Sequence, residues 1–168
     1  YNVLFGLLAM LFTSLFAKEL GGWRAGILTL VLLFLSPRFL GHAIMNPKDI
    51  PFAAGNIMAV YFMWRWLKNM PAIRWLDLLG LAGGMAIAIA TRAGGILLFA
   101  YLGLFAGLHF LVKYGWKGFV QNTGTLLKYA GYGLGTMIVA YAMAGLFLPF
   151  EMVDPIQHPV EALSAISK

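Results

Sequence analysis

Residues 78–112 read LLGLAGGMAIAIATRAGGILLFAYLGLFAGLHFLV, and this stretch decides the class of fold. Within it, Arg92 is the only Asp, Glu, Lys or Arg residue. Arg92 separates two apolar runs, at about residues 78–91 and 95–112. A membrane-spanning helix needs about 17–25 predominantly apolar residues. The pattern therefore predicts two neighbouring transmembrane helices joined by a short polar turn.

Four further apolar stretches extend this interpretation to most of the chain, at residues 3–17, 25–36, 51–67 and 126–150. The predicted fold class is all-α, a polytopic transmembrane helical bundle of about six helical segments. Two of the segments, 25–36 and 78–91, are short. We expect residues 1–168 to form one transmembrane domain, with residues 151–168 as an outer-face loop or amphipathic segment. The chain begins with Tyr1, and we expect it to be an internal fragment of a longer protein.

Composition supports lipid as the solvent of this domain. The chain is 61% hydrophobic and 11% charged, whereas a soluble domain has about 25% charged residues. It has no cysteine, which excludes disulfides and thiolate metal sites. The net charge of +6 comes from bases that stand singly or in pairs beside apolar runs. We therefore expect the lipid bilayer as a partner, and no nucleic acid.

The charges of the connecting segments predict the orientation of the chain. Residues 17–24, 65–77 and 112–128 carry eight bases and two acids. The alternate segments, residues 36–51, 91–95 and 151–168, carry four of each. Basic loops remain in the cytoplasm, so the first set is predicted to be cytoplasmic and the second to share the outer face. All five tryptophans fall near the inner ends and are expected to form an interfacial belt.

The polar interruption SPRFLGHAIMNPKDIPF, Ser36–Phe52, is the first candidate site on that outer face. Asp49 has two interpretations. It suits an N-cap for a helix that carries Pro51 in its first turn. It equally suits a carboxylate at the membrane surface, placed to accept a proton or to orient a sugar hydroxyl, and one residue can do both.

Three cations surround that carboxylate in the predicted topology. Arg38 and Lys48 lie within the interruption. Arg38 is either a snorkelling interfacial residue or a phosphate ligand, and Lys48 could assist it as a second cation. Arg92 ends a short apolar run, where an ionisable group is costly and commonly functional. We expect Arg92 at a helix end, within reach of the Arg38–Asp49 segment. Gly94 and Gly95 would let the backbone turn sharply and approach a ligand.

Two further polar residues complete the candidate set. His42 and Asn46 are four residues apart and share a face if this stretch is helical. His42, Asn46 and Asp49 do not make a metal-ligand signature. Whether the protein requires a divalent metal stays open. The glycines of residues 80–95 and 129–136 are interpreted as positions of close helix packing.

The chain resembles the integral-membrane glycosyltransferases of the C superfamily. It is most similar to bacterial relatives of protein O-mannosyltransferases and of the lipid A aminoarabinose transferase. The matching pieces are LSPRFLGHAIMNPKDIPFAAGNIMAVYF, GLAGGMAIAIATRAGGILL and DPIQHPVEAL, in that order.

The resemblance implies an inverting transfer of a sugar from a polyprenyl-phosphate-linked donor to an acceptor whose identity is unknown. The site would lie on the outer face of a bacterial inner (plasma) membrane. Asp49 would be a supporting acid, and the main catalytic acid would lie outside this chain, which would leave the fragment alone inactive. Arg38, Lys48, Arg92, His42 and Asn46 would bind the substrate or its lipid phosphate. The alternatives are a segment of a transporter or channel with interfacial charges, and a non-catalytic structural membrane subunit.

Overall fold

The structure, a computed structural model, describes residues 1–116 and 118–146, and this part of the chain is helical, without a strand. This confirms the predicted all-α class. The amphipathic segment predicted at residues 151–168 lies outside the described residues. The elements are α1 (Asn2–Phe34), α2 (Pro37–Met45), α3 (Asp49–Asn69), α4 (Trp75–Thr91), the 3-10 helix η1 (Ala93–Ile96), α5 (Leu97–Tyr114), α6 (Gly118–Gln121) and α7 (Thr123–Gly145).

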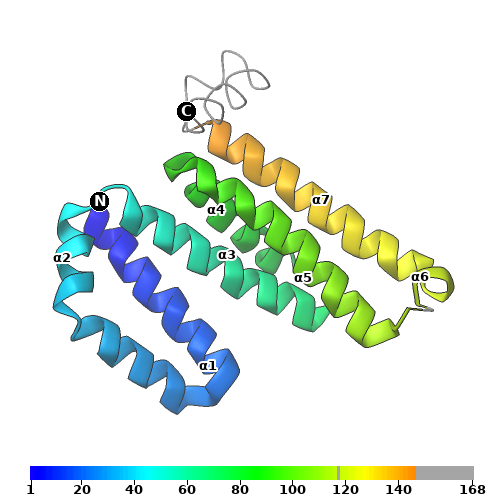
Figure 1. The fold of residues 1–168 in the computed structure, drawn as a ribbon, viewed down its shortest axis with the longest axis horizontal. Helices are drawn as coiled ribbons and strands as arrows, with labels where there is room; N and C mark the ends of the chain where they lie inside the picture. The colour runs from blue at the N-terminus through cyan, green and yellow to red at the C-terminus, as the bar shows by residue number, and fades with distance from the viewer. Residues whose placement is uncertain (117, 147–168) are drawn as a thin grey trace.

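Helix α1 is a hairpin whose two arms correspond to the first two predicted segments (Figure 1). The chain reverses at Gly22, where φ is 76° and ψ is −173°. Such a positive φ is easily adopted only by glycine. The arms are tied by a 2.6 Å hydrogen bond from Ser14 Oγ to the Gly26 carbonyl oxygen. The second arm ends at Phe34 and is the shorter one, as the sequence predicts.

Helices α3 and α4 pack together with their backbones in close approach. A Cβ atom added to Gly55 would lie 2.7 Å from the Ala88 nitrogen, and one added to Gly84 would lie 2.9 Å from the Gly55 oxygen. The expected close packing is therefore confirmed for Gly80 and Gly84 of α4, whereas Gly83 has only an ordinary contact with the Met58 side chain. The expectation is wrong for most of the second glycine group, because Gly131 and Gly135 have nothing within 4 Å of such an atom.

The core lies among α3, α4, α5 and α7. Its largest fully buried side chains include Trp66, Phe110, Leu81 and Met85. Trp66 is 1% exposed and packs on Tyr129, with ring centroids 5.9 Å apart. The prediction that Trp66 belongs to an interfacial belt is therefore wrong, because its indole fills the contact between α3 and α7.

The connections gather at two ends of the bundle, as the alternation of charge predicts. At one end, the Lys68 Nζ atom lies 2.9 Å from Glu19 Oε2, and Lys113 Nζ donates to the Met70 carbonyl oxygen at 2.7 Å. These contacts bring together the Gly22 turn, residues 70–74 and the end of α5, which we call the basic end. The opposite end holds α2, residues 46–48 and residues 92–95, and we call it the α2 end (Figure 1).

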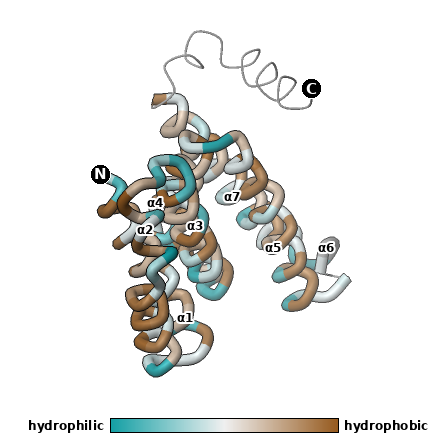
Figure 2. The backbone as a smooth tube through the Cα atoms, turned by 60° about the vertical axis from the view of Figure 1, so that its left-hand side comes forward, coloured by the Kyte–Doolittle hydropathy of each residue, from teal (hydrophilic) through white to brown (hydrophobic). Residues whose placement is uncertain are grey.

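Among the described residues, the α1 hairpin (Asn2–Phe34) and the stretch Ala93–Tyr114 each contain a helical run long and apolar enough to cross a membrane, and α4 is a shorter apolar helix. In Figure 2 the hydrophobic colour dominates the lengths of α1 and α5, while hydrophilic segments lie mainly near turns. Many large apolar side chains on these helices are exposed, such as Leu32 at 61% and Leu104 at 56%. Exposed apolar surface on this scale indicates association with a membrane or with other proteins.

Candidate functional site

The polar interruption contains a short helix rather than an irregular loop. Ser36 is the N-cap of α2, and its Oγ accepts a hydrogen bond from the Phe39 amide at 3.3 Å. Pro37 occupies the first turn, where a missing N–H has no cost. His42 lies in α2 and Asn46 is its C-cap residue, and the two side chains are in contact, as their spacing of four residues predicts for a helical stretch.

The N-cap residue of the following helix α3 is Lys48, and the Asn46 side chain accepts hydrogen bonds from the first amides of that helix. Asn46 Oδ1 accepts from the Asp49 amide at 2.9 Å and from the Lys48 amide at 3.2 Å. These amides belong to the start of a helix, whose first N–H groups lack partners within it. The prediction that Asp49 is the N-cap is therefore wrong: Asp49 is the first residue of α3, and its carboxylate is free for other contacts. Pro51 does lie in the first turn, as predicted.

Asp49 and Arg92 form an ion pair between the start of α3 and the end of α4. The contact joins Asp49 Oδ1 to an Arg92 Nη atom, and each side chain is 49% exposed. Arg92 is the C-cap of α4 and has extended backbone angles, so the helix ends there. The predicted proximity of Arg92 to the Arg38–Asp49 segment is confirmed. The pair leaves other guanidinium N–H groups able to bind an anion.

The same carboxylate is connected to His42 through Asn46. Asn46 Nδ2 donates to Asp49 Oδ2 at 2.6 Å and lies 3.3 Å from His42 Nδ1. Because an amide nitrogen is a donor, this contact is a hydrogen bond when His42 Nδ1 is unprotonated. His42, Asn46, Asp49 and Arg92 thus form one continuous polar row, which we call the Asp49–Arg92 row.

The two remaining predicted site residues have different positions. The Lys48 side chain is exposed at the rim of a groove beside the row. Arg38 is exposed at the opposite end of α2 from Asn46, and it has no hydrogen bond or ion pair with another described residue. The structure therefore brings together His42, Asn46, Lys48, Asp49 and Arg92, and leaves Arg38 apart from them.

The groove beside the Asp49–Arg92 row has a volume of about 480 Å³. It is bordered by the start of α1, the residues around Pro47 and the last turn of α4. Most of its wall is apolar, including Phe5, Pro51 and Ile87. Lys48 and Thr91, which line it, directly precede Asp49 and Arg92 in sequence. An apolar chain lying here would have its polar head next to the ion pair.

Gly95 serves the packing of the turn after Arg92. A Cβ atom there would lie 2.7 Å from the carbonyl oxygen of Ala88, so η1 lies directly against α4. The predicted sharp turn is present, with Gly95 N donating to the Arg92 oxygen at 2.9 Å. The sequence predicts that the backbone at Gly95 approaches a ligand closely. In the structure it instead approaches the backbone of α4.

A second polar cluster, at the basic end, was not predicted from the sequence. Asp77 is 1% exposed, and its Oδ1 lies 3.0 Å from Arg65 Nε. Asn69 Nδ2 donates to the other carboxylate oxygen at 3.2 Å, and Arg65 donates to the Tyr61 hydroxyl at 3.0 Å. The spacing of four residues places Tyr61, Arg65 and Asn69 on one face of α3, but the sequence does not show that Asp77 of α4 meets that face after the chain turns.

Among residues 1–116 and 118–146, no group of three or more His, Cys, Asp or Glu side chains could hold a metal ion. None of the known protein families, curated proteins or solved structures matches the chain.

Proposed function

We propose that this chain is a segment of a membrane-embedded glycosyltransferase that uses a polyprenyl-phosphate-linked sugar. In this proposal the Asp49–Arg92 row lies beside the lipid phosphate, on the outer face of a bacterial inner membrane. The observation that carries the proposal is the half-exposed Asp49–Arg92 ion pair beside an apolar groove.

The membrane part of the proposal is supported by the two long apolar stretches and by the distribution of charge. The basic end carries seven bases and two acids among its described residues, namely Lys18, Arg24, Arg65, Lys68, Arg74, Lys113, Lys128, Glu19 and Asp77. The positive-inside rule assigns that end to the cytoplasm. The α2 end then faces outward.

The phosphate part of the proposal is supported by the chemistry of Arg92. A guanidinium presents five N–H donors in a planar fork that matches a phosphate group. In glycosyl transfer from a lipid phosphate, negative charge develops on the leaving phosphate, and a positioned cation stabilises it. Lys48, at the rim of the same groove, supplies a second positive charge.

The role proposed for Asp49 is that of a supporting acid. Its carboxylate is held by Asn46 on one oxygen and by Arg92 on the other. A carboxylate held in this way keeps Arg92 in place and can accept a hydrogen bond from an acceptor hydroxyl or amine.

The transporter alternative is less well supported by these positions. Intramembrane charges that mark transport pathways face the interior of a bundle, commonly near the midplane. The charged side chains of the described residues instead lie near helix ends, as Asp49, Arg92 and Asp77 illustrate.

The proposal is tested by lipid binding to the purified protein. Native mass spectrometry would compare a polyprenyl phosphate with the polyprenol of equal length, which lacks the phosphate. We expect the phosphate to bind more tightly, and Arg92→Ala to reduce its affinity roughly 10–150-fold, the equivalent of about 1.5–3 kcal/mol for a charged hydrogen bond. Arg92→Lys should recover only part of this, because an ammonium lacks the fork.

Arg74→Ala is the matched control, because Arg74 is an exposed arginine at the basic end. It should bind the polyprenyl phosphate like the parent. Equal binding by the parent and Arg92→Ala would overturn the phosphate site. If the phosphate binds and the full-length enzyme of which this chain is proposed to be a segment transfers no sugar from such a donor in membranes, sugar transfer is overturned.

A further inference from the structure

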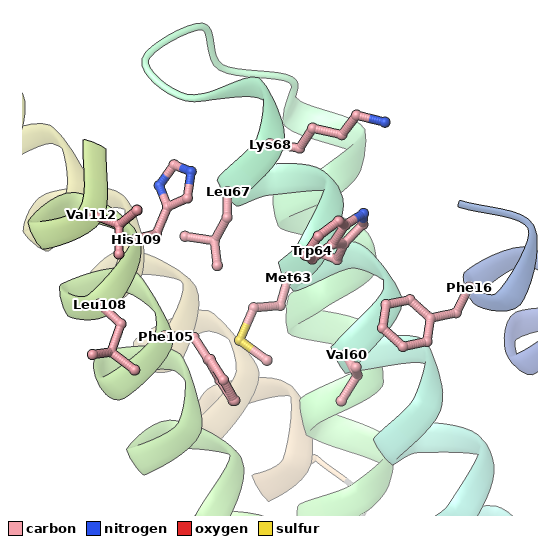
Figure 3. Close-up of a pocket in the computed structure, with 10 residues that line it drawn as sticks. All are labelled: Phe16, Val60, Met63, Trp64, Leu67, Lys68, Phe105, Leu108, His109 and Val112. Atoms are coloured by element: carbon pink, nitrogen blue, oxygen red, sulfur yellow. The ribbon is translucent and has the colours of Figure 1, made fainter. Parts of the chain in front are cut away.

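A second groove, at the basic end, lies between α3 and α5 and has a volume of about 650 Å³. It is within the range of about 300–1,000 Å³ that is typical of ligand pockets. Val60 and Met63 of α3 face Phe105 and Leu108 of α5 across it, and Phe16 of α1 closes one side (Figure 3). The groove is open toward the surroundings of the bundle along its length.

The polar residues of this groove gather at one end. In Figure 3, Lys68 and His109 lie toward the same end of the groove, with Leu67 between them, while Phe105 and Val60 lie toward the other. Lys68 is 59% exposed, so its ammonium group is available beyond its contact with Glu19. The groove is therefore amphipathic along its length, with an apolar body and a cationic head.

Two further groups lie near that head: Lys113 adds positive charge, and His109 adds a neutral hydrogen-bond donor. Lys113 follows the lining residue Val112, and its Nζ is held at the Met70 carbonyl oxygen. The Nδ1 atom of His109 lies 2.9 Å from the Tyr129 hydroxyl. In the tautomer whose Nδ1 accepts from Tyr129, His109 Nε2 carries a proton that can be donated to a phosphate oxygen.

We propose that this groove binds a membrane phospholipid with an anionic headgroup, with an acyl chain between α3 and α5 and the phosphate at Lys68 and His109. Basic pockets between transmembrane helices on the cytoplasmic side have the chemistry that anionic lipid headgroups require. The proposal rests on the membrane-spanning part of the proposed function and is independent of sugar transfer. This site is at the opposite end of the bundle from the Asp49–Arg92 row.

The test titrates phosphatidylglycerol or phosphatidylcholine into the detergent-solubilised protein and counts bound lipids by native mass spectrometry. We expect phosphatidylglycerol to be preferred. One basic side chain near an anionic lipid surface contributes about fivefold in affinity, so Lys68→Gln should remove about that much of the preference. Equal binding of the two lipids by the parent would overturn the proposal.

Two controls separate the lost charge from other effects of the Lys68 substitution. Glu19→Gln breaks the same ion pair but keeps the cation, and should retain or increase phosphatidylglycerol binding. Arg74→Gln removes an exposed cation of the same end that does not line the groove, and should leave the preference unchanged. If Lys68→Gln and Arg74→Gln lose the same amount of the preference for phosphatidylglycerol, the preference comes from diffuse surface charge, and the proposed site is overturned.

The apolar body of the groove is tested by filling it. Leu108→Trp places a larger side chain in the groove and should reduce lipid binding, whereas Leu104→Trp, on the same helix and outside the lining, should not. If Leu108→Trp keeps full lipid binding, the acyl chain does not lie there. If the parent binds no lipid and forms a dimer that Leu108→Trp disrupts, a second copy covers the groove and the lipid proposal fails.

Discussion

Arg65 Nε lies 3.0 Å from Asp77 Oδ1, and this ion pair ties the last turns of α3 to the first turn of α4 through a carboxylate that is 1% exposed. Asp77 Oδ1 is in ionic contact with Arg65 but accepts no hydrogen bond from the described residues. Asp77 Oδ2 accepts one from Asn69. A buried carboxylate depends on such partners, because an unpaired charge is costly away from water. The pair therefore fixes the geometry of the turn at residues 70–74.

We predict that Asp77→Ala destabilises the protein by about 1–3 kcal/mol, since it leaves Arg65 without its partner in a partly exposed setting. Unfolding in mixed detergent micelles would measure this. Glu19→Ala, which breaks the more exposed pair with Lys68, should cost less than about 1 kcal/mol. Equal effects of the two substitutions would contradict the structural importance of Asp77.

The close approach of α3 and α4 predicts opposite effects of alanine at different glycines. Gly84→Ala should destabilise by about 1–3 kcal/mol, because its Cβ would meet the backbone of α3. Gly103→Ala, on the open face of α5, should stabilise by about 0.4–1 kcal/mol, since nothing lies within 4 Å and alanine favours the helix. The same unfolding measurement compares them, and a stabilising Gly84→Ala would contradict the packing.

The proposed roles of Asp49 and Arg92 predict a separation of binding from turnover. Asp49→Asn keeps the shape of the side chain but removes its charge, so Arg92 is freer to bind phosphate. Binding of polyprenyl phosphate should stay equal or increase, while donor turnover by the full-length enzyme in membranes should fall, by up to roughly 10²–10⁴-fold where Asp49 assists proton transfer. Loss of lipid-phosphate binding in Asp49→Asn would mean that the carboxylate acts mainly by positioning the guanidinium.

Orientation is testable directly, because the chain has no cysteine of its own. Met45→Cys, at an 84% exposed position of α2, should react with a membrane-impermeant maleimide in intact cells. Ala72→Cys, in the exposed turn between α3 and α4, should react only after the membrane is permeabilised. Labelling of Ala72→Cys from outside would refute the predicted topology.

Much of the fold follows from apolar runs, because a continuous run of the right length suits a helix in lipid. The orientation of each helix does not follow from them. Trp66 is predicted at the interface from its place near the inner end of an apolar run, and that place does not reveal that its side of α3 packs against α7. The proximity of Arg92 to Asp49 was predictable, since topology places both segments at one end.

The details of the candidate site depend on local geometry that the residue types leave open. Both Asn46 and Asp49 are good capping residues, and only the backbone between them decides that Asn46 accepts from the first amides of α3 while Asp49 faces Arg92. The Arg65–Asp77 pair was missed because two charges in a basic connecting segment are equally compatible with exposed side chains.

The position of α7 has a consequence for how the chain is made. α4 packs on α3 and on α7, which is the last described helix, and Trp75 of α4 contacts Tyr132 of α7 with ring centroids 6.3 Å apart. Domains are completed from the N-terminus during synthesis. A nascent chain that has just finished α5 therefore still has one face of α4 uncovered. That face of α4 is covered only after residues 123–145 have left the ribosome. Until then it must be shielded by lipid or by the insertion machinery.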